Sequence, residues 1–442
     1  EPVLSAAKTA GKAPCSTEKT KLGERTQKMK YEHGQLLFSA TDLAHHLSCQ
    51  HLTELERRLA EGGLSRDFHR DPVRELLIEL GQRHEQEYLE LLKSNRASVV
   101  EIKEFGGQES IEKTIAAMRD GVDVIAQAAL VSLPWRGRAD FLIKVDKPSE
   151  LGEWSYEVAD TKLAQTTRAG TVLQLCLYSE ILAGLQGLQP NTMYVVRPGA
   201  PFDIEPLRVA DFAAYYRMVK RHFEEYVETG PRESSYPEPN PHCQTCDWWR
   251  NCKQTWRSDD HLTFVAGMGK AQIGELDVHA IKTLESFAAA ETPLPAPPKR
   301  GSIETFEKLH RQAQIQVEGR RAGEPRYAFN EVEQRRGFLR LPEPSQGDIF
   351  FDIEGYPRAI GDSLEYLLGY VTRESETPIY HRQWGLSKQD ERRAFVDFMD
   401  LVMERWRNWP DMHIYHFAPY EPSALKRLAT RHAIREAELD QL

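Results

Sequence analysis

Residues 155–178 read SYEVADTKLAQTTRAGTVLQLCLY and decide the fold of the first half of the chain. The β-rich run up to Ala159 predicts a strand, and the apolar periodicity after Thr171 predicts a helix. Asp160 and Lys162 lie two positions apart at the end of the strand, so their side chains point to the same face. One of them can hold a metal ion while the other polarises water or contacts a phosphate.

The flanking sequence extends this strand and helix into an α/β domain. Helical periodicity runs from about residue 36 to residue 92 and carries His84. Asp140 begins a predicted strand after a turn with the sequence WRGRA. The other expected elements are strands at 97–102, 122–131, 139–145 and 192–196 and a helix at 209–228.

Four cysteines bracket these elements. One precedes them and three follow as C-x2-C-x5-C, namely Cys49, then Cys243, Cys246 and Cys252. This spacing predicts a metal site, and a set of four thiolates suits either tetrahedral zinc or a four-iron cluster. The two remaining cysteines, Cys15 and Cys176, are expected to ligate nothing.

The ordered motifs resemble the PD-(D/E)xK nucleases with their restriction-endonuclease-like fold, and within them the RecB-type exonucleases. The resemblance implies Mg²⁺ or Mn²⁺ as the metal and DNA, single-stranded or at duplex ends, as the substrate. It implies that Lys162 orients water or stabilises charge and that Gln174 and Tyr178 support DNA. It also implies a ligand set of His84, Asp140, Asp160 and the carbonyl of Thr161.

One cysteine before the nuclease motifs and three after them resembles the iron-sulfur nucleases, namely the AddB-type subunits and the CRISPR-associated nucleases. The resemblance implies a [4Fe-4S] cluster on Cys49, Cys243, Cys246 and Cys252 that ties the two ends of the domain together. Zinc is the alternative metal.

A second pair of acids, Asp352 and Glu354, lies on one face of the apolar strand in DIFFDIEGYP. The strand and the hairpin pattern after it resemble the RNase H-like fold of DnaQ-type 3'-5' exonucleases. That resemblance makes Glu421 the candidate third ligand of a second metal site. No final acid motif precedes Leu442, and we expect this domain to be truncated.

The predicted organisation has five parts. They are a disordered leader at 1–30, the nuclease with its four-cysteine staple at 31–257, a helix-hairpin-helix-like unit and linker at 258–300, a helical connector at 301–345 and the RNase H-like domain at 346–442. This order resembles a family of bacterial RecB-like nucleases that often continue into a superfamily 1 helicase. A helicase, on the same or a separate chain, is therefore the expected partner.

Bulk composition narrows the function further. The net charge of -10 gives no global basic field, so contact with nucleic acid must come from local patches. No apolar run reaches the roughly 20 residues of a membrane span, and sparse cysteines without a signal peptide predict a cytoplasmic protein. We expect a deoxyribonuclease of repair, recombination or defence, an exonuclease rather than an endonuclease. The alternatives are a non-catalytic iron-sulfur DNA-binding scaffold and a zinc-stabilised structural protein.

Overall fold

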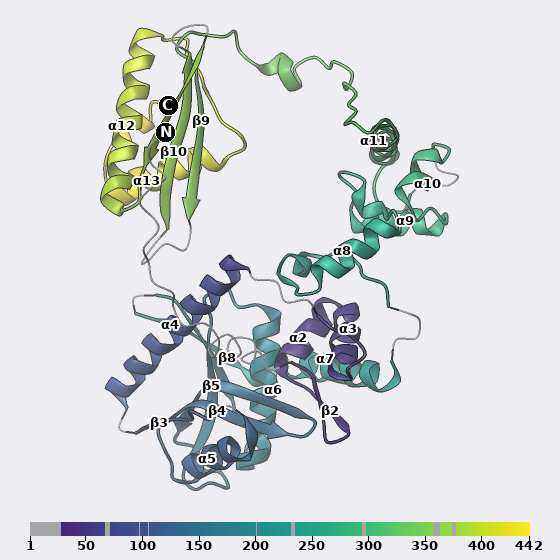
Figure 1. Ribbon diagram of the computed structural model, residues 1–442. Coiled ribbons are helices and arrows are strands. Elements are labelled where there is room, and N and C mark those ends of the chain that lie inside the picture. The colour runs from purple at the N-terminus through teal and green to yellow at the C-terminus, as the bar shows by residue number, and fades with distance from the viewer. Residues whose placement is uncertain are drawn as a thin grey trace, which may run out of the picture. The chain divides into compact units, whose positions relative to one another are not determined.

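The computed structural model describes residues 28–66, 71–96, 98–104, 106–199, 201–230, 235–293, 298–356, 363–373 and 377–442. The chain forms two compact units, residues 1–327 and residues 328–442 (Figure 1). Most of the expected leader lies outside the described residues, and the first strand begins at Lys30. Within the described ranges, no helix has both the length and the apolar character needed to cross a membrane.

A six-stranded mixed sheet forms the centre of the first unit. Its order is β3-β4-β5-β6-β7-β8, with β3/β4 and β6/β7 parallel and the other pairs antiparallel. The strands are β3 (Val99–Glu101), β4 (Val124–Ser132), β5 (Trp135–Val145), β6 (Ser155–Thr161), β7 (Thr192–Arg197) and β8 (Asp203–Arg208). β6 is buried along almost its whole length, as expected for a strand covered on both faces.

Helices cover both faces of this sheet. On one face α5 (Gly107–Arg119) and α6 (Ala169–Gln186) pack over alternate strand residues such as Leu142 and Val158, and α7 (Val209–Thr229) packs against α6. On the other face α4 (Pro72–Asn95) covers the residues in between, such as Phe141 and Ala159. The alternation follows from the two-residue period of a strand.

The two ends of this domain meet in a small separate cluster. A hairpin of β1 (Lys30–Glu32) and β2 (Gln35–Leu37) leads to α2 (Ala40–Ser48), α3 (Gln50–Ala60) follows, and η1 (Pro241–Thr245) and α8 (Trp249–Ser258) close the domain. Ser39 caps α2 through a capping box with Asp42. Leu52 of α3 packs with Trp248 and with Cys252 and Trp256 of α8.

The rest of the first unit is helical. It consists of η2 (Leu262–Phe264), α9 (Lys270–Val278), α10 (Leu284–Ala289) and α11 (Ile303–Ala322). Leu276, Phe287 and Leu309 share one hydrophobic core. α11, which the sequence places in a connector, therefore packs on the same core as the stretch expected to form a helix-hairpin-helix-like unit.

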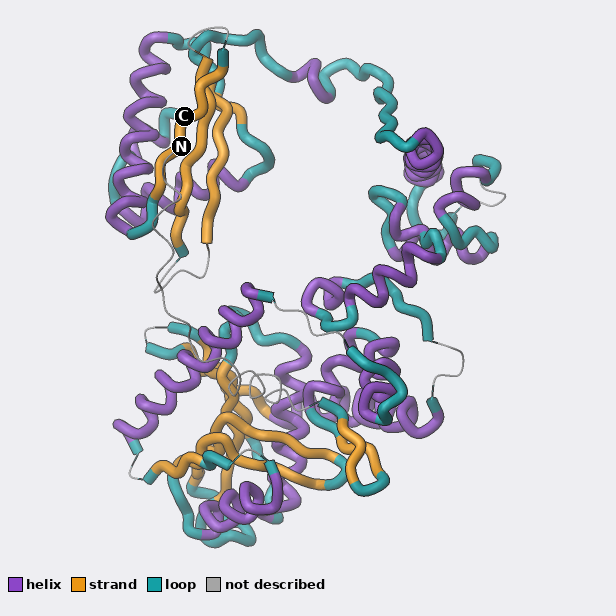
Figure 2. Tube along the Cα trace, in the orientation of Figure 1, coloured by secondary structure: helices purple, strands orange, loops and turns teal. Residues whose placement is uncertain are grey.

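The second unit is a four-stranded sheet of order β11-β10-β9-β12 with helices packed on one face (Figure 2). The strands are β9 (Ile349–Tyr356), β10 (Leu364–Arg373), β11 (Pro378–Trp384) and β12 (Ile414–Tyr415). The packed helices are α12 (Lys388–Asn408), α13 (Tyr420–His432) and α14 (Glu436–Leu439), whereas η3 (Gly337–Arg340) precedes the sheet and is exposed. Ile349, Phe351 and Ile353 of β9 face the core beneath α12 and α13.

The structure adds elements that the sequence patterns do not predict, namely α5, β8 and the β1–β2 hairpin. It also corrects the place of Asp140, which lies in the middle of β5 rather than at the start of a strand. The segment WRGRA is itself strand, because Trp135, Gly137 and Ala139 alternate as buried positions, and the turn falls before Trp135.

Candidate active site

Two strand acids meet at the end of the β5/β6 ladder. That ladder pairs Phe141 with Ala159, so the next position places Asp140 opposite Asp160. Asp160 is 0% exposed. Asp140 Oδ2 accepts the backbone N–H and the Oγ1 hydroxyl of Thr161, both at 2.8 Å. Burial, followed by the nearby Asp140 carboxylate, raises the pKa of Asp160 to about 7. A buried carboxylate beside a half-buried one is costly unless a cation accompanies them.

Lys162 supplies one such cation. Its Nζ forms an ion pair with Asp160 Oδ2, and 31% of its side chain remains exposed. Burial lowers the pKa of Lys162, but the Asp160 and Asp140 carboxylates raise it by more, so the lysine stays protonated. Asp160 Oδ2 has no hydrogen-bond donor of good geometry among the described residues. This oxygen therefore keeps acceptor capacity for a metal ion.

A third carboxylate, Glu85 of α4, approaches the same pair. Burial, followed by the Asp140 charge and also the Asp160 charge, raises the pKa of Glu85 to about 7. The side-chain amide of Gln127 donates to Glu85 Oε1. Glu85 was not among the predicted site residues, although it directly follows His84 in the motif G-x-x-H-E, which was the signal available in the sequence.

His84 lies at the neighbouring end of β7. Its Nε2 is 3.1 Å from the Val196 carbonyl, which also accepts the Lys162 backbone N–H at 2.9 Å. The ring is buried and packs against Phe202 with 5.4 Å between ring centroids. This shared carbonyl places His84 beside the Asp160–Lys162 end of β6, and its role as a metal ligand stays a prediction.

Gln174 contacts Asp160 directly, and Tyr178 lies beside Gln174. Gln174 Nε2 donates to Asp160 Oδ1 at 3.1 Å and lies 3.5 Å from the Tyr178 hydroxyl. Tyr178 is 5% exposed, and Gly137 of β5 makes room for its ring, because a Cβ there would lie 2.2 Å from Tyr178 Cε1. The structure thus gives both residues a positioning contact, and their predicted contact with DNA stays a prediction.

Gln127 is the other residue that sequence reasoning missed. It has a φ of 58°, an uncommon conformation for a residue with a side chain. The β4/β5 ladder pairs its two neighbours in an unchanged register but skips Gln127 itself. Its carbonyl oxygen accepts Arg138 Nε at 2.6 Å while its amide donates to Glu85. Backbone strain of this kind is concentrated at functional sites.

The donor set suits a hard divalent cation. Carboxylate oxygens are the ligands that Mg²⁺ prefers, and a cation beside them would lower the raised pKa values of Asp160 and Glu85. In the described ranges, however, no group of three or more His, Cys, Asp or Glu side chains is already arranged to hold a metal ion. Binding would therefore require small movements of these side chains.

The four predicted cysteine ligands line one pocket, together with Trp248. Cys49 lies at the N-cap of α3, and burial raises its pKa although the backbone N–H groups of Leu52 and His51 lower it in part. Backbone N–H groups lie 3.4 Å from Cys243 Sγ and from Cys246 Sγ. Burial raises the pKa of Cys246 to about 11 and that of Cys252 to about 12, so both thiols hold their protons unless a metal displaces them.

The four thiols are the ligand type that a thiophilic metal prefers, but the space between them is too small for a cluster. The cavity between them has a volume of about 10 Å³, the size of one water molecule. The thiols would have to move apart to accept a cluster, and the absence of a ready metal-binding group among the described residues applies to them as well. Cys176 is buried in α6 and is not among the residues that line this pocket, and Cys15 lies outside the described residues.

In the second unit, Asp352 and Glu354 project from the face of β9 opposite the core. They line a pocket of about 140 Å³ together with Phe350 and Tyr380. Glu421 is 3% exposed, and its Oε2 lies 3.3 Å from His416 Nδ1. Glu421 is not among the described residues that line this pocket, so the predicted three-acid site stays a prediction.

Paired carboxylates and a lysine at the end of adjacent strands are groups that metal-dependent phosphodiesterases use. A family model described as the PD-(D/E)XK nuclease superfamily matches residues 23–253, more than half of the chain, and the chain belongs to this superfamily. A second model, described as the RNase H superfamily, matches residues 349–441, so the second unit contains a domain of that superfamily. No curated protein matches the chain at a significant level.

Proposed function

We propose that the first unit is a Mg²⁺- or Mn²⁺-dependent deoxyribonuclease. The observation that carries the proposal is the convergence of Asp140, Asp160 and Lys162 at one strand end, in a chain of a nuclease superfamily. The residues that would hold the metal are Asp140, Asp160, the Thr161 carbonyl and His84, with Glu85 as an additional candidate.

The bound cation would neutralise charge on the phosphate and make a nearby water more acidic. Protonated and partly exposed, Lys162 can orient that water or stabilise negative charge that develops on the phosphate. Gln174 fixes one oxygen of Asp160, and Thr161 fixes one oxygen of Asp140. Asp140 Oδ1 is left for the metal, and Asp160 Oδ2 would be shared between the metal and Lys162.

A cleavage assay with labelled DNA and Mg²⁺ or Mn²⁺ tests the proposal. We expect Lys162→Ala and Asp160→Asn each to abolish cleavage. Lys144→Ala is the matched control, because Lys144 also lies in this sheet and pairs with an aspartate, Asp123, at 2.6 Å. Cleavage that continues at the unmutated rate in Lys162→Ala would refute this site, and no cleavage by the unmutated protein would favour the non-catalytic scaffold.

We also propose that Cys49, Cys243, Cys246 and Cys252 bind a [4Fe-4S] cluster that staples the domain, with zinc as the alternative. The support is that thiols from both ends of the domain line one pocket and that backbone amides point at two of the sulfurs. An aromatic wall of Trp248, Trp249 and Trp256 would shield the cluster from water.

Anaerobic purification followed by iron, sulfide and zinc analysis separates these metals. We expect visible absorbance, about four irons per chain by the cluster's stoichiometry, and loss of both the metal and thermal stability in Cys246→Ala. Cys176→Ala is the control, because this cysteine is buried, more fully than Cys246, but lies outside the pocket. Colourless protein with one zinc would establish zinc, and unchanged melting of Cys246→Ala would refute the staple.

The proposed mode is exonuclease action on single strands or duplex ends, in repair, recombination or defence, together with a helicase on the same or another chain. A comparison of linear with circular single-stranded DNA tests the mode, because an exonuclease leaves the circle intact. Cleavage of the circle would establish endonuclease action instead.

For the RNase H domain, we propose a second metal site at Asp352 and Glu354. Both carboxylates line one small pocket on the open face of the sheet. In a Lys162→Ala background, residual cleavage that disappears with Asp352→Asn would support it. Residual cleavage unchanged by Asp352→Asn would exclude this site.

A further inference from the structure

We propose that a groove along α7 binds the phosphodiester backbone of a single nucleic-acid strand, apart from the catalytic carboxylates. The inference rests on the proposed nuclease function, because it gives that enzyme a second contact with its substrate. It is carried by the shape of a large pocket in the first unit and by the charges along it.

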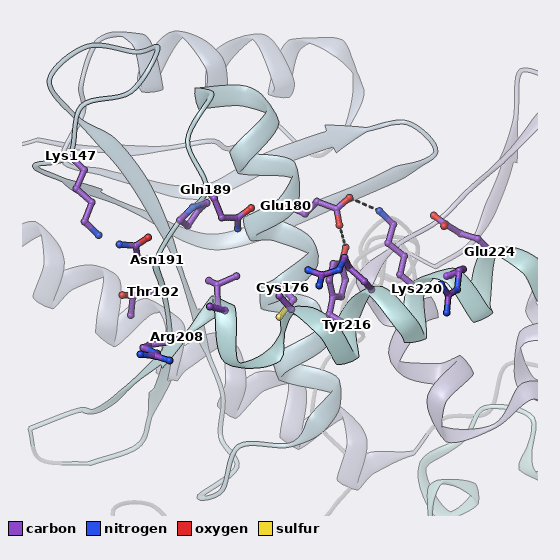
Figure 3. Close-up of a pocket in the computed structure, with 16 residues that line it drawn as sticks. Lys147, Cys176, Glu180, Gln189, Asn191, Thr192, Arg208, Tyr216, Lys220 and Glu224 are labelled. Carbon is purple, nitrogen blue, oxygen red and sulfur yellow. Dashed lines mark hydrogen bonds and ion pairs between the residues drawn. The ribbon is translucent and has the colours of Figure 1, made fainter.

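The groove is long and narrow. It has a volume of about 950 Å³, and its floor follows α7 from Val209 to Glu224, about 22 Å at 1.5 Å per residue. These values give a mean cross-section on the order of 40 Å², which is too small for a duplex, since its major groove alone is about 12 Å wide and about 8.5 Å deep. Figure 3 shows Arg208 and Thr192 at one end and Lys220 and Glu224 at the other.

Five cationic side chains and two acidic side chains line the groove. Of the two acids in the lining, Glu180 accepts Lys220 Nζ and the Tyr216 hydroxyl, both at 2.6 Å (Figure 3), and Glu224 accepts the Trp135 indole N–H at 2.7 Å.

The basic side chains at the rim are less engaged. Arg217 has no ion-pair partner among the described residues, and Arg221 has only a contact of 3.8 Å with Glu225. Arg208 and Lys147 add two further cations at the end where α7 begins, although Arg208 pairs with Asp211 at 2.6 Å and Lys147 with Glu157 at 3.1 Å. Cations spaced along a narrow groove suit a polyanion rather than one phosphate group.

Helix α6 separates this groove from the catalytic carboxylates. Gln174 and Tyr178 are four residues apart and face Asp160, whereas Cys176 and Glu180 line the groove. An offset of two residues places the two pairs on opposite sides of a helix. A nucleic-acid segment bound in the groove would therefore be held there while another segment of the same molecule is cut at the carboxylates.

Fluorescence anisotropy with a labelled oligothymidylate longer than the groove, in EDTA and over a range of salt, tests the groove without cleavage. We expect Arg217→Ala/Arg221→Ala to reduce the slope of log affinity against log salt by about 1.4 and the affinity about 25-fold at about 0.1 M salt. The matched control is Lys308→Ala/Arg311→Ala, two exposed cations of α11. Arg217→Lys/Arg221→Lys should restore most of the affinity.

The groove proposal would be overturned if Arg217→Ala/Arg221→Ala bound DNA with the same affinity and salt slope as the unmutated protein. It would also be overturned if Lys308→Ala/Arg311→Ala lost as much affinity as Arg217→Ala/Arg221→Ala. Parallel titrations with DNA and RNA of equal length show which strand is preferred. Lys162→Ala should abolish cleavage, and the loss of affinity caused by Arg217→Ala/Arg221→Ala should be the same in its background. If the unmutated protein cleaves no DNA, the proposed nuclease function fails. The anisotropy result still tests the groove in that case, because it does not depend on cleavage.

Discussion

Replacing Gly137 with alanine should damage the active site without touching any charged residue. The added Cβ would lie 2.2 Å from Tyr178 Cε1, whereas ordinary contacts begin at 3.4 Å, so the ring must move by about 1.2 Å. Tyr178 is 5% exposed and cannot turn away to solvent. Overpacking of this size costs about 1–3 kcal/mol of unfolding free energy.

The displacement of the Tyr178 ring should also move the Asp160 carboxylate. Tyr178 lies beside Gln174, and Gln174 fixes Asp160, so a displacement of about 1 Å passed along this chain should lower cleavage about 100-fold. Urea denaturation and initial cleavage rates measure the two effects. Gly184→Ala is the control: nothing lies within 4 Å of its added Cβ, and alanine should stabilise α6 by about 1 kcal/mol.

A double-mutant cycle isolates the clash. Tyr178→Ala alone should cost about 3–5 kcal/mol, as for other large aromatic truncations. With the ring gone, Gly137→Ala should cost nothing further, which makes the two changes coupled by about 2 kcal/mol. Additive losses, or a Gly137→Ala protein with normal stability and cleavage, would refute the reasoning.

Three further predictions concern other parts of the first unit. Gln127→Gly should relieve the left-handed backbone and raise stability by about 1 kcal/mol, yet slow cleavage because Glu85 loses its amide donor; denaturation and rate measurements check both effects. Burial, followed by the charge of His222, lowers the pKa of His46 from 6.5 to about 4, so its stabilising contribution is complete above pH 6.5 and lost as the pH falls toward 4. The loss should be about 2 kcal/mol at about pH 5 and absent in His46→Gln, as measured by urea titration. Trp248→Phe should cost about 2 kcal/mol, because it removes the indole hydrogen bond to buried Glu56 at 3.0 Å, and calorimetry checks this value.

The sequence alone locates much of the site, since Asp160 and Lys162 follow from strand periodicity. The opposition of Asp140 to Asp160 did not follow, because it depends on the β5/β6 register, which is a long-range property. Gln127 was missed for a related reason. Its importance lies in a left-handed φ inside a strand, and a glutamine gives no local signal of that conformation.

The distribution of charge in the α7 groove could not be predicted from the sequence either. A net charge of -10 indicates no attraction for nucleic acid, yet the acids in the groove are engaged by Lys220, Tyr216 and Trp135 while Arg217 and Arg221 face its rim. Which charges are compensated depends on tertiary contacts rather than on composition. The family matches likewise give the two superfamilies but not these contacts.

The hydrogen bond between Trp248 and Glu56 joins residues 192 positions apart in the chain. On a ribosome that adds about 5–20 residues per second, roughly 10–40 s pass between the synthesis of the two partners. During that interval α3 has emerged without the tryptophans that cover it, and Leu52 remains uncovered. Chaperone binding to the nascent chain should therefore peak before residue 248 emerges and fall once the C-terminal segment of the domain is free to dock.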